Sequence, residues 1–233
     1  VHQLSRRRRD RDEILDIFIP LHVIHRGVRP QCEVDTLHKL REAKSMLDIP
    51  LIGSLNCVFT ETWVEYAELI EKTGVDGLEL NFLSVPRDFD TEAKSIEDEQ
   101  VAVVEQVCKK VKIPVSVKLS PFYTNTLQVI RRMEKAGAKA FVLFNRMFEP
   151  DINLDTLQHS TPFNLSTEGD YRLALRYAGV LYGNTKAAIC SSSGIYTGHD
   201  LAKMILAGAD AVQMVSALYK HKPELITNIL ADL

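Results

Sequence analysis

The sequence predicts an α/β protein in which parallel strands and helices alternate, and two observations support this. From residue 49 onward, short apolar and β-branched runs alternate with segments whose apolar residues recur every three to four positions, the pattern of strands and amphipathic helices. Boundary motifs also repeat, because Gly74-Val-Asp-Gly, Gly137-Ala-Lys-Ala and Gly208-Ala-Asp-Ala each end a helix at a glycine and begin a strand.

Six strands are expected, each followed by a helix. They cover Ile49–Asn56, Gly77–Phe82, Val115–Ser120, Ala140–Arg146, Ala187–Ser193 and Ala211–Ala217. The glycine motifs recur at intervals of roughly 65 residues, which is the length of two βα units, or one quarter of an eight-stranded barrel. The predicted fold is therefore a TIM-type (β/α)8 barrel that is incomplete, with six clear βα units.

Residues before position 49 fit this pattern poorly. They offer an arginine run, an apolar stretch over Ile14–Ile24 with room for at most one strand, and an expected helix over Val34–Leu47. We expect residues 1–48 to form an N-terminal extension and residues 49–233 to form one domain, the partial barrel. Three alternatives explain the missing quarter: a truncated chain, a barrel completed by a partner chain, or an irregular N-terminal plug.

Composition and motifs exclude several classes of protein. Of the 233 residues 45% are hydrophobic and 25% charged, with a net charge of -3, which argues against a nucleic-acid partner. No apolar run reaches the ~18–20 residues of a membrane span. The four cysteines are widely spaced without a C-x-x-C motif, which suits a reducing compartment, and we expect a cytoplasmic protein. A doubly wound nucleotide-binding sheet is disfavoured, since neither of its glycine motifs occurs.

Polar side chains follow the expected strands, at the end where barrels of this type carry their chemistry. These strand-end residues are Asn56, Glu79, Asn81, Lys118, Ser120, Asn145, Arg146 and Ser191 to Gly194. The set holds no carboxylate or histidine cluster, so no metal site is expected. Three asparagines around one lysine can hydrogen-bond a planar heterocycle, while the ammonium stabilises negative charge on a reduced ring, and this favours a flavin.

Loops after the last two expected strands favour a phosphate site. Ser191–Gly198 and Val215-Ser216 lie where barrels of this type bind phosphate, and Gly194 and Gly198 permit close approach of the backbone. Ser84 follows the second expected strand and is a candidate proton acceptor, although serine needs help to act as a base. Taken alone, each of these features also fits an ordinary turn.

Several ordered motifs resemble those of one known family, the dihydroorotate dehydrogenases, which are FMN-dependent βα barrels. The motifs are Ile49–Asn56, Glu79-Leu-Asn81, Val117–Pro121, Leu143–Arg146 with Pro150-Asp-Ile152, and Ala207–Asp210. The resemblance runs from about Val34 to the C-terminus, is greatest to the bacterial dihydroorotate dehydrogenase-like branch, and leaves the family's first two strands without a counterpart. It implies an FMN-dependent dehydrogenase of pyrimidine metabolism, acting on a CH–CH group and passing a hydride from a dihydropyrimidine-like small molecule to FMN.

The resemblance also implies a role for particular residues. Ser84 takes the catalytic-base position, and Lys118 binds the cofactor and stabilises the reduced flavin. Asn56, Asn81 and Asn145 hold the flavin ring and the substrate, with Arg146 on the substrate side. The FMN phosphate positions are Ser193, Gly194, Val215 and Ser216. Ser193 and Val215 stand where typical members carry glycine, and Arg146 stands where they carry a hydroxyl residue.

Two other functions stay open. One is a catalytically inactive or partner-completed truncated barrel, which functions as a homo-oligomer or with a second chain, because an open sheet exposes edges that invite association. The other is a Schiff-base aldolase in which Lys118 is the nucleophile.

Overall fold

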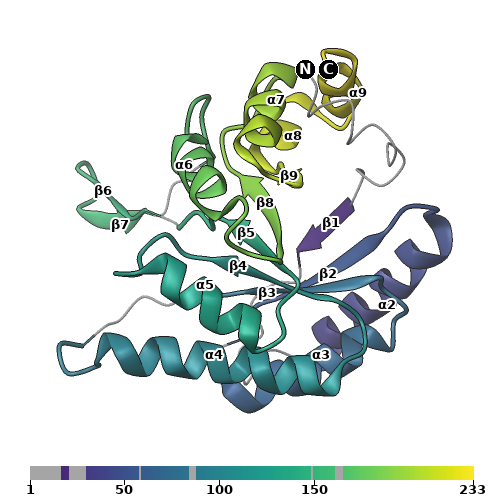
Figure 1. The fold of residues 1–233 in the computed structure, drawn as a ribbon, viewed down its shortest axis with the longest axis vertical. Coiled ribbons are helices and arrows are strands. Elements are labelled where there is room, and N and C mark those ends of the chain that lie inside the picture. The colour runs from purple at the N-terminus through teal and green to yellow at the C-terminus, as the bar shows by residue number, and fades with distance from the viewer. Residues whose placement is uncertain (1–16, 21–29, 58, 84–87, 148, 161–164) are drawn as a thin grey trace. The chain divides into compact units, whose positions relative to one another are not determined.

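The computed structural model describes residues 17–20, 30–57, 59–83, 88–147, 149–160 and 165–233 (Figure 1). The chain divides into two compact units. Unit 1 comprises Val1–Asn81, Pro86–Val117 and Arg132–Lys139, and unit 2 comprises Phe82–Val85, Lys118–Arg131 and Ala140–Leu233. Each unit has its own buried apolar core.

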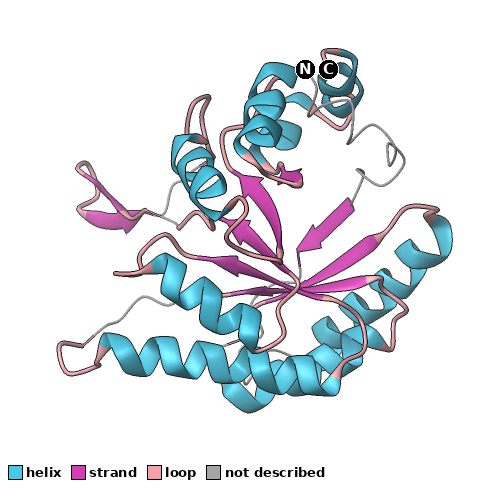
Figure 2. Cartoon of the chain, in the orientation of Figure 1, coloured by secondary structure: helices cyan, strands magenta, loops and turns pink. Residues whose placement is uncertain are grey.

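Unit 1 is built on parallel strands. Strand β1 (Ile17–Pro20) pairs with β2 (Leu51–Leu55), which pairs with β3 (Gly77–Asn81). The amide of Leu78 donates to the carbonyl of Pro114 at 2.9 Å, beside the start of β4 (Val115–Leu119). Helices α2 (Pro30–Met46), α3 (Thr60–Glu71) and α4 (Ala93–Lys110) belong to this unit, and α3 and α4 lie along the same side of β2 and β3 (Figure 2).

The apolar periodicity of the sequence explains how these helices pack. Helix α3 buries Trp63, Tyr66, Ala67 and Ile70 on one stripe, and burial of a large aliphatic side chain such as Ile70 stabilises the fold by about 1.5–3 kcal/mol. A Cβ on Gly53 of β2 would lie 2.7 Å from Cγ2 of Ile70, so the glycine lets α3 approach the strand. The alternation of buried strand and amphipathic helix therefore specifies this unit.

Unit 2 repeats the plan. Strand β4 enters it at Lys118, and the amide of Asn145, just after β5 (Ala140–Leu143), donates to the carbonyl of Leu119 at 2.7 Å. Strand β5 pairs in parallel with β8 (Ala188–Ser192), which pairs with β9 (Ala211–Gln213). The helices of this unit are α6 (Arg172–Leu181), α7 (Gly198–Ala207), α8 (Ser216–His221) and α9 (Leu225–Ala231), while α5 (Thr126–Lys135) begins here and ends in unit 1.

The expected fold class is confirmed as an incomplete TIM-type α/β barrel. All six expected strands are present within the predicted ranges, and the apolar stretch Ile14–Ile24 supplies the short strand β1. The three glycines expected to end helices, Gly74, Gly137 and Gly208, have φ values of 89°, 119° and 115°. Glycine adopts this left-handed conformation without the cost that a Cβ imposes, which explains why the motif repeats.

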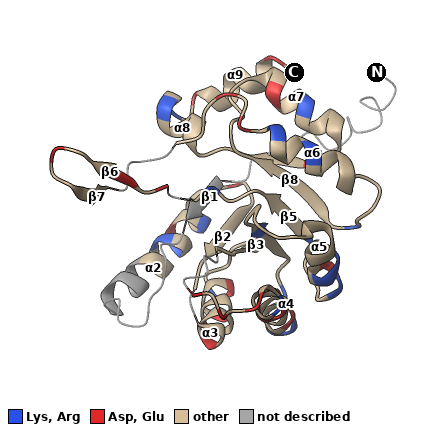
Figure 3. Ribbon diagram, turned by 90° about the vertical axis from the view of Figure 1, so that its left-hand side faces the viewer, with Lys and Arg blue, Asp and Glu red and all other residues tan. Residues whose placement is uncertain are grey.

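Two details of the prediction are wrong. The strand expected over Ala211–Ala217 ends at Gln213, because the backbone leaves the extended region at Val215, where ψ is -58°, and Ser216 begins α8. Strand β5 is not followed directly by a helix. An antiparallel hairpin of β6 (Asp151–Asn153) and β7 (Gln158–Ser160) intervenes, and it projects from the rest of unit 2 (Figure 3).

Candidate functional site

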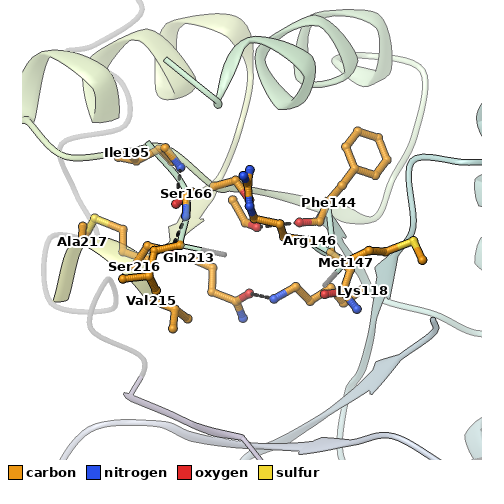
Figure 4. A pocket seen from close by; sticks show the side chains of 16 residues that line it. Lys118, Phe144, Arg146, Met147, Ser166, Ile195, Gln213, Val215, Ser216 and Ala217 are labelled. Atoms are coloured by element: carbon orange, nitrogen blue, oxygen red, sulfur yellow. Dashed lines mark hydrogen bonds between the residues drawn. The ribbon is translucent and has the colours of Figure 1, made fainter. Parts of the chain in front are cut away.

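Unit 2 contains a cavity of about 200 Å³ at the carboxyl ends of its strands (Figure 4). Its walls come from the last residues of β4, β8 and β9 and from the segments that follow β5, β8 and β9. The lining residues are Lys118, Phe144, Asn145, Arg146, Met147, Leu165, Ser166, Ser192, Ser193, Gly194, Ile195, Gln213, Met214, Val215, Ser216 and Ala217. This is the end of the strands at which βα barrels carry their chemistry.

Lys118 occupies one side of the cavity and is 9% exposed. Its Nζ donates to Oε1 of Gln213 on β9 at 2.7 Å (Figure 4). Strands β5 and β8 lie between β4 and β9 in the sheet of unit 2, so this bond joins two strands that are not neighbours. Both side chains must therefore project from the inner face of a curved sheet, as barrel closure requires.

The segment after β5 supplies a second side of the cavity. Asn145 is half-buried there, and Arg146 pairs with Asp170 through a 2.8 Å contact between Nη1 and Oδ2. About a third of each of these side chains is exposed, so the pair contributes little to stability. The hydroxyl of Ser192 on β8 donates to the carbonyl of Phe144 at 3.0 Å, which holds this segment against the end of β8.

Ser166, which is 4% exposed, joins the loops that follow β8 and β9. Its Oγ accepts a hydrogen bond from the amide of Gly194 at 3.2 Å, and its own amide donates to Oγ of Ser216 at 2.9 Å. Its carbonyl accepts from the hydroxyl of Tyr196 and from Nζ of Lys220. Two of the residues expected at a phosphate, Gly194 and Ser216, are therefore held in place by one serine.

Packing within the chain explains the two glycines of this region. Gly194 has a φ of 69°, and a Cβ there would lie 2.7 Å from the carbonyl of Thr167 and from the amide of Asp170. A Cβ on Gly198 would lie 2.7 Å from the carbonyl of Ile229 in α9. Both glycines thus allow close approach of backbone from the same unit.

The structure brings together seven of the site residues that the sequence predicts. Lys118, Asn145, Arg146, Ser193, Gly194, Val215 and Ser216 all line the cavity. Asn56 follows β2 and Asn81 ends β3, both in unit 1 and both half-buried. Ser84, the candidate base, lies outside the described residues.

Two polar lining residues, Gln213 and Ser166, are not among the predicted site residues. Gln213 lies in the middle of the strand expected over Ala211–Ala217, but in the structure it ends β9 and is therefore a strand-end residue like Lys118. Ser166 lies in the run Leu165-Ser-Thr-Glu-Gly169, whose composition is that of an ordinary turn before a helix. Its partner Ser216 is 50 positions away, and no local signal in the sequence indicates that pairing.

The chemistry of the lining fits part of a flavin mononucleotide. Lys118, Asn145 and Gln213 offer an ammonium and two amides, which suit the polar edge of a planar heterocycle. The hydroxyls of Ser166 and Ser216 border the same cavity and suit phosphate oxygens. Cofactor pockets usually measure about 300–1,000 Å³, so this cavity of about 200 Å³ provides room for a portion of such a cofactor.

Among the residues described, no three His, Cys, Asp or Glu side chains gather as metal ligands would. Within that part of the chain, every helix is too short or too polar to cross a bilayer.

The known proteins and the family model that this chain resembles all carry the same family name. The family described as "Dihydroorotate dehydrogenase" matches residues 30–233. The chain is 33% identical over 177 residues to "Dihydroorotate dehydrogenase B (NAD(+)), catalytic subunit" of Thermoplasma volcanium, covering 74% of this chain and 58% of that protein. It is 31% identical over 197 residues to "Dihydroorotate dehydrogenase A (fumarate)" of Lactiplantibacillus plantarum, covering 80% and 62%. The chain thus spans about three fifths of the length of these relatives.

Proposed function

The chain belongs to the dihydroorotate dehydrogenase family, and from this premise we propose that it binds FMN and transfers a hydride to it from a dihydropyrimidine-like substrate. Members of the family are FMN-dependent. One observation supports the proposal most: a single cavity gathers Lys118, Asn145 and the two serine-bearing loops. These are the groups that the resemblance assigns to the cofactor.

Bound FMN would supply the two-electron acceptor, and the residues of the chain would bind and orient the reactants. The ammonium of Lys118 would stabilise the negative charge that a flavin ring gains on reduction. Asn145 would hydrogen-bond the ring or the substrate, and Arg146 would attract an anionic group of the substrate. Asn56 and Asn81 are proposed to share the binding of ring and substrate, and Ser84 to take the substrate proton.

An absorption spectrum tests the proposal first. The purified chain is expected to show the visible bands of a flavin, and chromatography of the released cofactor should identify about one FMN per chain. Anaerobic addition of candidate dihydropyrimidines should then bleach the flavin bands. Lys118→Met should bleach at least 100-fold more slowly, the scale of loss when one electrostatic donor is removed from an active site.

The matched control is Gln128→Met on the exposed side of α5, which should behave as wild type. A chain that binds no FMN after reconstitution with excess cofactor would contradict the proposal. A chain that binds FMN but is bleached by no dihydropyrimidine would contradict the substrate class alone.

A second candidate is a barrel that a partner completes or that no longer catalyses. Ser193 and Val215 stand where the resemblance places glycine, and these changes motivate the loss of catalysis. One of the relatives is a "catalytic subunit" by name, which suggests a protein that works with another chain. A stable monomer that holds FMN tightly would exclude this candidate.

Residues 1–48 are proposed as an N-terminal extension to the domain over residues 49–233, and the protein is proposed to act in the cytoplasm with neither a membrane nor a nucleic-acid partner. The aldolase hypothesis predicts that borohydride traps a carbonyl substrate on Lys118, detected as a mass increase of its peptide.

A further inference from the structure

The hydrogen bond between Lys118 and Gln213 spans the inner face of unit 2. Nζ of Lys118 lies 2.7 Å from Oε1 of Gln213, and the two residues are 95 positions apart in the chain. Both line the cavity. A lysine ammonium is a point charge on a flexible four-carbon stem, so its direction is set by whatever accepts its hydrogen bonds.

Gln213 is itself held firmly. Its backbone pairs with Ser192 in the β8–β9 register, and the Ser192 hydroxyl donates to the carbonyl of Phe144. The backbone of Gln213, from which its side chain reaches Lys118, is therefore fixed by the same strands that form the cavity. An acceptor with this support can hold a flexible ammonium in one direction.

The acceptor is neutral, and this matters for the chemistry of the cavity. A carboxylate at position 213 would also hold the ammonium, but it would offset the positive charge that Lys118 brings to the cavity. An amide oxygen orients the ammonium and leaves its charge intact. An apolar side chain would do neither.

We propose that Gln213 is a positioning residue that holds the Lys118 ammonium in a fixed direction along the cavity wall without neutralising it. The proposal rests on the proposed function for its consequence, which is that an oriented positive charge favours reduction of a flavin bound beside it. The orientation of Lys118 itself is a property of the chain alone and can be measured without cofactor.

The experiment compares the full-length wild-type chain with Gln213→Met, which keeps the length but removes the acceptor, and Gln213→Glu, which keeps the acceptor but adds a charge. Acetic anhydride acetylates free lysine amines, and peptide mass spectrometry follows Lys118 against exposed Lys110 as an internal reference. Gln128→Met controls for the introduction of a methionine. The midpoint potential and the dissociation constant of added FMN are measured on the same proteins.

Gln213→Met is expected to acetylate Lys118 at least fivefold faster than wild type and to bind FMN at least fivefold more weakly. Gln213→Glu should keep Lys118 as protected as in wild type, yet give bound FMN a more negative midpoint potential. Gln128→Met should match wild type in every measurement. If Lys118 is protected from acetylation in Gln213→Glu but not in Gln213→Met, the role of Gln213 is to position the ammonium and not merely to pack against it.

The proposal is overturned if acetylation of Lys118 in Gln213→Met stays within twofold of wild type, or if Gln213→Glu exposes Lys118 as much as Gln213→Met does. If Gln213→Met does not fold, Gln213→Asn replaces it, because the shorter amide withdraws the acceptor while remaining polar. Failure of wild type to bind FMN would refute the proposed function, and the acetylation rates would still decide the role of Gln213.

Discussion

Cys57 lies just after β2 in unit 1, and its thiol is almost closed to solvent, with 7% of the residue exposed. Burial raises the pKa of this thiol from 9.0 to about 12. The folded chain therefore keeps the thiol proton at a pH where the unfolded chain releases it. The contribution of the protonated thiol to the free energy of unfolding is fully present below pH 9 and is lost as the pH rises toward 12.

The free energy of unfolding is expected to fall between pH 8 and pH 10 by about 1.4 kcal/mol more in wild type than in Cys57→Ala. Urea unfolding at the two pH values measures this difference. The only tryptophan of the chain, Trp63, is buried in α3 of unit 1 and reports the transition by fluorescence. An equal fall in both proteins would show that the thiol titrates normally in the folded chain.

Ser193 lines the cavity in a backbone conformation that favours glycine. Its φ is 75°, next to Gly194 with a φ of 69°. A residue with a Cβ pays a conformational cost in this region, which exceeds the entropy cost of glycine. Ser193→Gly is therefore expected to raise the free energy of unfolding by about 0.5–1 kcal/mol.

Chemical unfolding followed by circular dichroism checks this, with Ser192→Gly as the matched control. Ser192 lies in β8 and donates to the carbonyl of Phe144, so its replacement should destabilise the chain by about 1–2 kcal/mol. A loss of stability in Ser193→Gly would mean that interactions of the serine side chain outweigh its backbone strain.

Ser166, in the segment before α6, connects the loops that follow β8 and β9 through hydrogen bonds to Gly194 and Ser216. Ser166→Ala removes the acceptor of the Gly194 amide, a loss of about 0.5–1.5 kcal/mol that should loosen the loop bearing Ser193 and Gly194. We expect FMN to bind about three- to tenfold more weakly, while riboflavin, which has no phosphate, binds as in wild type. Fluorescence titrations with both flavins measure the contrast.

Ser45→Ala is the control for this contrast, because the hydroxyl of Ser45 donates to a backbone carbonyl of α2 in unit 1. It should change the affinity for neither flavin. Equal weakening of FMN and riboflavin in Ser166→Ala would place the effect at the ring end of the cavity rather than at the phosphate.

Helix α7 begins with a reciprocal cap. Oγ1 of Thr197 accepts from the amide of Asp200 at 3.1 Å, and the carboxylate of Asp200 accepts from the amide of Thr197. Burial opposes ionisation of Asp200, but the hydrogen bonds from Thr197 and Lys203 outweigh it and lower the pKa of the carboxyl group. The contribution of this carboxylate is thus present above pH 4 and lost as the pH falls further.

Thr197→Ala is expected to lower the free energy of unfolding at pH 7 by about 1 kcal/mol, whereas Thr197→Ser, which keeps the hydroxyl, should cost less than about half of that. Chemical unfolding monitored by circular dichroism provides the comparison. Equal losses in both variants would attribute the effect to the methyl group instead of the cap.

The elements also show what a single sequence can and cannot predict. Strands such as β2 and β4 were predictable because buried parallel strands form continuous apolar runs. Strands β6 and β7 were not, because Asp151–Asn153 and Gln158–Ser160 have only three residues each, mostly exposed, and carry no apolar alternation. The positions of the strand ends predicted Lys118 and Asn145 as site residues. Gln213 and Ser166 form hydrogen bonds with partners 95 and 50 positions away, and only the folded chain brings these partners together.

Considered as a whole, the chain either holds the proposed cofactor alone or shares it with a second copy. Unit 2 supplies a lined cavity from a single chain, which favours binding by one copy. The second candidate proposed above is completion of the barrel by a partner chain. These alternatives predict different effects of protein concentration on the affinity for FMN. A site that needs two copies binds FMN more tightly as the protein becomes more concentrated.

We expect one FMN per chain and a dissociation constant that changes less than about twofold when the protein concentration rises about 100-fold. Fluorescence titration at the two concentrations measures the affinity, and sedimentation velocity of the same samples measures the oligomeric state. Affinity that rises in step with dimer formation would establish a shared site between copies. Constant affinity in a sedimenting monomer would show that the partial barrel of one chain forms the complete flavin site.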